Sequence, residues 1–243
     1  MAQDQLVERP KMAKKIDRPA GLVVDPLPVG NVPDLRPIHG RWMRLVPVST
    51  VKHASDLFAS FDGKDPEGHV WTYMGYGPFA SAEEFTEWVK QREAARDPWF
   101  YAFVRRDTGK AVGMGAFMRN DAANGVIEIG HIWMSPELQQ TREATEAIYL
   151  MMRYCFDDLG VRRLEWKCDH LNAASRKAAD RFGFTFEGIF RQHLIIKGRN
   201  RDTAWFSMLD TEWPKARSAF EAWLKDDNFD EKGIQKAKLR VGT

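Results

Sequence analysis

Apolar positions in the first half of the chain repeat at the spacing of a strand and then at the spacing of helices. Residues 41–48 (RWMRLVPV) alternate as a strand does, and the next segment, capped by Ser49 or Thr50, has apolar residues at helical spacing. Ser81 and Glu84 have capping-box spacing, which predicts the start of a second helix. The pattern therefore predicts one strand followed by two helices.

Three strands are expected next, as a meander. Residues 99–106 and 111–119 flank the sequence DTGK, which is typical of a β-hairpin turn, and residues 126–135 (VIEIGHIWMS) continue the sheet. A helix then follows and ends at Gly160. Its expected buried face consists of Ala144, Ile148, Met151, Cys155 and Leu159.

The last third of the chain predicts a strand, a helix, a hairpin and a final helix. Residues 162–169 form the strand, and a helix is bounded by Asn172 as N-cap and by Gly183 just after its end. The hairpin covers residues 186–209 around the turn KGRNRD, and residues 213–224 form an amphipathic helix. This order predicts an α/β (α+β) fold, a mixed sheet flanked by helices.

Prolines define a different segment at the start of the chain. They are Pro10, Pro19, Pro26, Pro28, Pro33 and Pro37. Their spacing excludes a persistent helix or central strand, so we expect an extended arm over residues 1–38. A single domain is expected over residues 39–225 and a polar tail over residues 226–243.

Composition narrows the function. Lys plus Arg number 36 against 34 Asp plus Glu, a formal charge of +2, which is too balanced for nucleic-acid binding. No apolar run approaches the roughly 18 residues of a membrane span, and no signal peptide is recognised, so a soluble cytoplasmic protein is expected. Cys155 and Cys168 lack metal-ligand or redox spacing, which predicts reduced core thiols and no metal site.

Several motifs in one order resemble the GNAT superfamily of acetyl-CoA-dependent N-acetyltransferases. They are EIGHIW, ATEA, RRLEWKCDHLNAASRKAADRFGFTFEG and KGRNRDTAWFSMLDTEW, within about Arg41 to Asp210. The RimJ/RimL branch, ribosomal-protein N-acetyltransferases, is the most similar. The resemblance implies a largely antiparallel sheet whose fourth and fifth strands splay apart, and acetyl-CoA as co-substrate.

The stretch SPELQQTREATEA (135–147) corresponds to the pyrophosphate loop of that family, Q/R-x-x-G-x-G/A. Gln139 and Ala144 fit the first and last positions, whereas Arg142 replaces the glycine. Unpaired N–H groups and the helix dipole bind phosphate in such a loop, so Arg142 can serve if its backbone is helical. The residues expected to contact the diphosphate are Gln139, Gln140, Thr141, Arg142, Glu143, Ala144 and Thr145.

The resemblance also implies contacts to the pantetheine arm and a general acid. Backbone groups of Trp133 and Met134, and the side chain of Asn172, are expected to bind pantetheine. Ala179 stands where many superfamily members have an acidic tyrosine, so Ser175 of the N-x-x-S motif is the expected acid for the departing thiolate. That thiolate has a pKa of about 8.5.

The general base is open, because Leu194 occupies the position of the branch's glutamate. An alkylammonium with a pKa near 10.4 must lose a proton before it attacks a thioester. Glu128, acting through a water, is favoured, followed by His131 and His193. Strand alternation predicts that Glu128 and His131 face opposite sides of the sheet.

Two segments are expected to line the acceptor channel: the aromatic loop VWTYMGYGPF and the turn KGRNRD. The residues concerned are Trp71, Tyr73, Tyr76, Lys197, Arg199 and Arg201. The basic residues suit an acidic or carboxylate-bearing acceptor. The expected partner is an amine, from either a protein N-terminus or a small molecule, and a homodimer is a reasonable expectation. The alternative function is a non-catalytic sensor or interaction module that binds coenzyme A.

Overall fold

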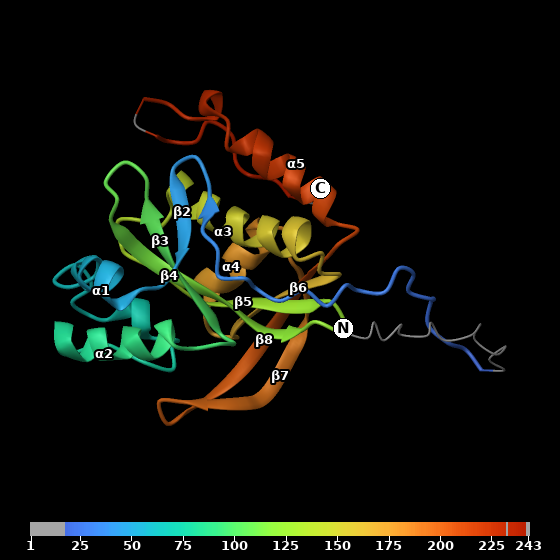
Figure 1. Cartoon of the computed structure of the whole chain (residues 1–243), viewed down its shortest axis with the longest axis horizontal. Helices are drawn as coiled ribbons and strands as arrows, with labels where there is room; N and C mark the ends of the chain where they lie inside the picture. The colour runs from blue at the N-terminus through green and yellow to red at the C-terminus, as the bar shows by residue number, and fades with distance from the viewer. Residues whose placement is uncertain (1–17, 232, 242–243) are drawn as a thin grey trace, which may run out of the picture.

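A single mixed sheet organises the chain (Figure 1). The computed structural model describes residues 18–231 and 233–241; the rest of the expected arm and tail lies outside the described residues. Within the described residues eight strands run in the order β1-β2-β3-β4-β5-β6-β8-β7. They are β1 (Ile38–His39), β2 (Met43–Pro47), β3 (Trp99–Arg105), β4 (Ala111–Asp121), β5 (Val126–Met134), β6 (Arg163–Asp169), β7 (Thr185–Ile196) and β8 (Arg199–Leu209).

A fork between β5 and β6 is the feature that positions the site. These two strands form the sheet's parallel pair, and their pairing covers residues 126–128 against 163–165. Beyond that point β5 continues to Met134 and β6 to Asp169 with no pairing between them. The family resemblance predicted that the fourth and fifth strands of the fold splay apart. These strands are β5 and β6 here, and the splay is confirmed.

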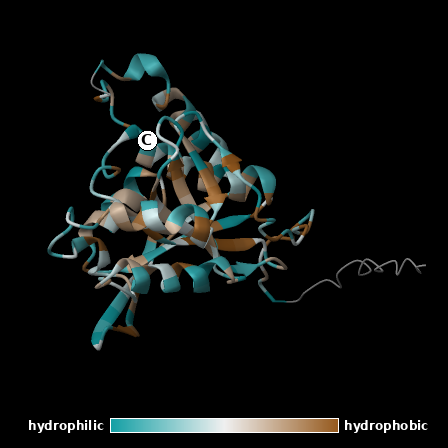
Figure 2. Cartoon of the chain, turned by 60° about the vertical axis from the view of Figure 1, so that its left-hand side comes forward, coloured by the Kyte–Doolittle hydropathy of each residue, from teal (hydrophilic) through white to brown (hydrophobic). Residues whose placement is uncertain are grey.

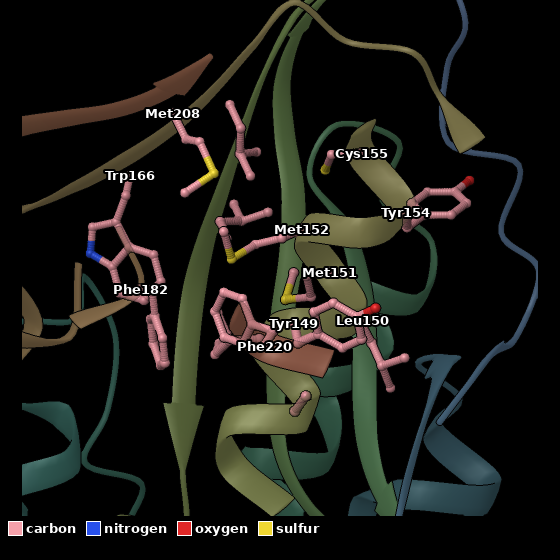
Figure 3. Packing of buried hydrophobic residues seen from close by; sticks show 14 of the residues in the cluster. Tyr149, Leu150, Met151, Met152, Tyr154, Cys155, Trp166, Phe182, Met208 and Phe220 are labelled. Atoms are coloured by element: carbon pink, nitrogen blue, oxygen red, sulfur yellow. The ribbon is translucent and has the colours of Figure 1, made fainter. Parts of the chain in front are cut away.

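Helices cover both faces of the sheet and enclose two hydrophobic cores. On one face lie α1 (Thr50–Ala59) and α2 (Ala82–Glu93); on the other lie α3 (Arg142–Arg153), α4 (Ala173–Arg181) and α5 (Trp213–Trp223). Figure 3 shows side chains of α3 among Trp166, Phe182 and Phe220 of β6, the end of α4, and α5. Figure 2 shows hydrophobic strands at the centre and hydrophilic outer helix surfaces. Short helices η1 (His69–Trp71) and η3 (Asp226–Asn228) complete the elements.

Most predicted helix boundaries agree with the structure. Ser81 caps α2 by accepting from the Glu84 N–H at 3.2 Å, and Asn172 caps α4 by accepting from the Ser175 N–H at 3.0 Å. The predicted apolar face of α3 is buried, and the helix finishes in a π-helical turn, Tyr154–Asp158, before Gly160. Local capping chemistry was sufficient for these predictions because each cap bonds within its own turn.

The predicted six-residue turn KGRNRD is shorter in the structure. Lys197 and Gly198 alone connect β7 to β8, both with positive φ (48° and 72°), the conformation of a two-residue hairpin turn. Arg199 and Arg201 therefore belong to strand β8. Because a strand fixes the face on which each side chain lies, this correction gives Arg201 a defined orientation.

A buried carboxylate attaches the start of the domain to α3. Glu146 accepts from the backbone N–H groups of Arg41, Trp42 and Met43 at 2.7–2.8 Å. Hydrogen bonds to a charged group contribute about 1.5–3 kcal/mol each. This contact places the β1–β2 turn beside the first turns of α3.

The arm and the tail both pack against the domain where they are described. Asp34 accepts from the Tyr154 hydroxyl at 2.7 Å, and Arg36 pairs with Asp158 at 2.6 Å. In the tail, Phe229 and Leu239 are buried in the same core as α3. The expected division at residues 38 and 225 stays a prediction, and parts of both segments contribute to the packed structure.

Candidate active site

The main chain of β5 supplies one edge of the fork. The Ser135 N–H donates to the Val112 carbonyl at 3.0 Å, so the hydrogen-bonding groups of Trp133 point to β4 and those of Met134 point into the fork. The Met134 carbonyl accepts from the Gln139 side chain at 3.1 Å, which leaves its N–H available. The expectation that both residues offer main-chain groups is thus wrong for Trp133, because strand alternation directs it to β4.

The loop before α3 keeps three amides free. Within the described residues, the N–H groups of Gln140, Arg142 and Glu143 have no hydrogen-bond acceptor, and they lie at the positive end of the helix dipole. The N–H groups of Gln139, Thr141, Ala144 and Thr145 are already bonded within the loop. The predicted set of seven main-chain donors is therefore reduced to three, because capping consumes the others.

The structure explains why Arg142 can stand where the family's motif has a glycine. Arg142 is the first residue of α3, after the extended Thr141 cap, and needs no positive φ; Gln140 is the loop residue with φ of 62°. The Arg142 guanidinium lies over the Trp42 ring at 4.7 Å and bonds Glu143 at 3.2 Å. A bulky residue therefore fits this position because its side chain turns toward Trp42.

Asn172 and Ser175 lie on the β6 side of the fork. Because Asn172 serves as the N-cap, its side-chain oxygen is occupied by the Ser175 N–H. The Ser175 hydroxyl oxygen accepts from the Trp166 indole N–H at 2.9 Å. One lone pair of Ser175 is thus filled, and its hydroxyl also forms a side-chain hydrogen bond with the Cys168 thiol. The hydroxyl still carries the proton that a general acid would donate.

Glu128 belongs to a row of alternating charges across the sheet. Lys167 Nζ lies 2.8 Å from Glu128 and 2.6 Å from Glu165, and its side chain is only 4% exposed. Arg119 approaches Glu128 at 3.6 Å. Arg163 then joins Glu165 to Glu187. Burial raises the pKa of Glu128 although Lys167 opposes this, and the paired carboxylate has little freedom to take a proton from an amine.

His131 faces the same side of the sheet as Glu128, contrary to the alternation prediction. His131 has φ of 49° and, with Ile132, lies opposite Gly115 in a β-bulge. The extra residue shifts the alternation by one, so His131 contacts the rings of Tyr76 and Phe100 on the α1–α2 face. Sequence spacing gave no sign of this bulge.

The imidazole of His131 is held neutral. Its Nδ1 lies 3.1 Å from the Tyr76 hydroxyl. Burial lowers the pKa of His131 to about 4, and the charges of Arg92, Arg119 and Arg201 act in the same direction. Burial also keeps Tyr76 protonated by raising its pKa, so its hydroxyl can donate to Nδ1 when the imidazole proton is on Nε2.

The loop between α1 and α2 contacts β5, the segment after β6 and the tip of the β7–β8 hairpin. Besides the Tyr76 contact to β5, the Tyr73 hydroxyl donates to the Leu171 carbonyl at 3.1 Å, after β6. Lys197 donates to the Trp71 carbonyl at 2.8 Å from the hairpin tip. The Trp71 side chain is buried in the core with 1% exposure, which corrects its expected role as an acceptor wall. Its carbonyl supports the wall instead.

The hairpin contributes two half-buried groups on the same sheet face. His193 Nδ1 lies 2.9 Å from Thr203 Oγ1, and Arg201 Nε donates to the same oxygen at 3.1 Å. Burial lowers the pKa of His193, helped by Arg119 and Arg201. Arg199 is exposed near the hairpin tip. Tyr73, Tyr76 and Lys197 thus contact segments beside the fork, whereas Trp71 is buried and Arg199 is exposed, and their role as acceptor residues stays a prediction.

Comparison with known proteins decides the family. The model of the acetyltransferase (GNAT) domain matches residues 43–185. A crystal structure of a GCN5-related N-acetyltransferase from Brucella melitensis has a TM-score of 0.83 and 47% identity, covering 85% of this chain and 93% of that chain. The chain belongs to the GNAT acetyltransferase family. This GNAT protein is accordingly an enzyme of the N-acetyltransferase class, as the resemblance predicted.

Curated relatives of this GNAT protein are more distant. Uncharacterized N-acetyltransferase p20 of Bacillus licheniformis is 28% identical over 152 residues, 61% of this chain and 84% of that protein. YdaF of Bacillus subtilis (strain 168), which carries the provisional name of a ribosomal N-acetyltransferase, is 30% identical over 105 residues, 43% of this chain and 57% of that protein. They agree with the acetyltransferase assignment.

Sequence reasoning about this GNAT protein missed Lys167 and Arg119. Arg163, Glu165 and Lys167 alternate along β6, and that period of two was an available sign of a charged strand face. Arg119 has φ of 51° at a second irregularity in β4, which no sequence signal marked.

The described part of the chain also bears on metal ligands, thiols and membrane spans. No cluster of three or more His, Cys, Asp or Glu residues there is arranged to hold a metal ion. Cys155 and Cys168 are buried free thiols, and burial raises the pKa of both. None of the described helices has the length and apolarity to cross a bilayer.

Proposed function

We propose that the protein transfers the acetyl group of acetyl-CoA to a primary amine by direct attack in a ternary complex. The fork carries this proposal, since unpaired strand edges suit an extended pantetheine arm and three free amides before α3 suit a diphosphate. The provisional name of YdaF favours the RimJ/RimL branch.

The residues of this chain would divide the chemistry as follows. The amine nitrogen forms a bond to the thioester carbonyl carbon, and the carbon–sulfur bond breaks. The main-chain N–H of Met134, which points into the fork, would stabilise the developing oxyanion. Ser175 would donate its proton to the departing thiolate, and the nitrogen loses its proton to solvent or to a water held by the polar face around Glu128 and His193.

Thiol release from acetyl-CoA across a panel of amines, beside calorimetric binding of coenzyme A, tests this function. Coenzyme A binding together with amine-dependent thiol release and a mass increase of one acetyl group on the amine is expected. Binding with no transfer to any amine would contradict the proposal and favour the non-catalytic sensor, the reading supported by Ala179 and Leu194.

Ser175→Ala tests the proposed acid. Turnover should fall about tenfold or more, within the usual range of general-acid effects, whereas coenzyme A affinity should change little. Ser175→Ala also leaves the Trp166 indole N–H unpaired, so Trp166→Phe serves as the control: it removes the same hydrogen bond but keeps the hydroxyl. Equal turnover losses in both variants would assign Ser175 a structural role.

A further inference from the structure

Arg119 of β4 and Arg201 of β8 both interact electrostatically with Glu128, and Arg201 also feels the charge of Arg119. Resting on the proposed acetyl transfer, we infer that the acceptor is a small amine that also carries a carboxylate, bound by Arg201 of β8 with Arg119 of β4 beside it. An α-amino acid has this chemistry. The positions of their partners, Glu128 for Arg119 and Thr203 for Arg201, define where such a carboxylate would lie.

Arg201 is the cation in this region that has guanidinium donors to spare. It shares a sheet face with Thr203 and Trp205, and its Nε is fixed by Thr203 Oγ1 at 3.1 Å. Within the described residues its two terminal nitrogens have no hydrogen-bond acceptor, and no carboxylate lies within 4 Å. Burial lowers the pKa of Arg201, yet a guanidinium stays charged at any ordinary pH. A half-buried, oriented guanidinium is well suited to bidentate carboxylate binding.

The cations of β6 and the lysine at the hairpin tip do not have this freedom. Lys167 lies between Glu128 and Glu165, and Arg163 is bonded to Glu165 and Glu187. Lys197 at the hairpin tip is used by the Trp71 carbonyl. Arg119 lies 3.6 Å from Glu128, and its side chain is 46% exposed. It can therefore add positive charge near a bound carboxylate, but part of its charge is already balanced by Glu128.

The charge at this place also bears on the amine. Arg119 and Arg201 each lower the pKa of both His131 and His193, which shows that their positive field reaches the two imidazoles. The same field would repel an ammonium and favour its neutral, nucleophilic form. A carboxylate on the acceptor offsets that repulsion during binding. The countercharges facing Arg201 are Glu128 and Asp169, which interact with it through space without an ion pair.

The experiment compares matched acceptors. L-phenylalanine, its methyl ester and phenethylamine share a side chain and differ in the carboxylate; the ester's more acidic ammonium biases the comparison against the inference. We expect kcat/KM for L-phenylalanine to exceed the other two at least tenfold in the wild type. Arg201→Ala and Arg201→Gln should remove that preference by raising KM, about tenfold or more, as for a lost charged hydrogen bond.

Arg191→Ala is the matched control. Arg191 is an exposed arginine on the same hairpin, so its loss changes net charge equally and should leave the preference intact. Coenzyme A affinity of each variant shows that it is folded. Equal use of amines with and without a carboxylate would overturn the inference and leave acetyl transfer standing. Coenzyme A binding without transfer to any amine would overturn the proposed function, and the inference with it.

Discussion

At the scale of single residues, the chemistry of the site depends on which polar atoms already have a hydrogen-bond or ion-pair partner. Glu128 is the carboxylate among the candidate bases, but its Oε2 is paired with Lys167 and approached by Arg119. His131 is neutral, but a pKa of about 4 makes it a weak proton acceptor at neutral pH. A positive field that lowers the pKa of the acceptor amine reduces the need for a strong base.

The low pKa of His131 gives a pH prediction. The unfolded imidazole has a pKa near 6.5, so between about pH 6.5 and 4 the unfolded chain binds a proton that the folded protein does not. His131 should therefore make the free energy of unfolding fall as pH decreases through this window, with no contribution above it. Unfolding by denaturant from pH 4 to 7.5 should show a flatter profile for His131→Gln.

His69→Gln is the control, because His69 is 75% exposed beside Glu67. It should keep the wild-type profile. If the free energies of unfolding of the wild type and His131→Gln fall in parallel as the pH decreases, the inference that the buried imidazole of His131 is neutral is wrong. Nitrogen NMR on the wild type should also show the proton on Nε2 of His131, with Tyr76→Phe changing that tautomer.

At the scale of elements, the beginning of α3 keeps free amides although it has no glycine. The Thr141 cap is extended (φ −94°, ψ 167°), and Arg142 follows as the first helical residue. The side chain lies over Trp42, so the free amide and the guanidinium of Arg142 are separable contributions.

The variants Arg142→Ala and Arg142→Pro separate the contribution of the Arg142 amide from that of its guanidinium. Both lose the guanidinium, but only proline loses the N–H, and proline is well tolerated at the first helical position after an extended residue. Calorimetry should give coenzyme A affinity within about threefold of wild type for Arg142→Ala and about tenfold weaker for Arg142→Pro. A comparable large loss in both would identify the guanidinium as the main phosphate ligand.

At the scale of the whole molecule, the fold was largely predictable and the site only in part. Capping residues such as Ser81 and Asn172, and the spacing of apolar residues in α3, are local signals, and the structure agrees with them. The three-stranded meander and the hairpin followed from alternation and turn residues. The bulge at His131 and the burial of Trp71 depended on packing against other segments, which local patterns do not contain.

The sequence by itself determined the order of the main helices and strands and the family, because periodicity, caps and motifs are properties of neighbouring residues. The place of the diphosphate loop stays a prediction. Only the tertiary structure decided which amides stay free, that Glu128 is paired, and that Arg201 is open toward the acceptor side. These outcomes depend on hydrogen-bond and ion-pair partners brought together from β4, β5, β6 and β8. A charged group's chemistry is set by such partners, and residues distant in sequence supply them.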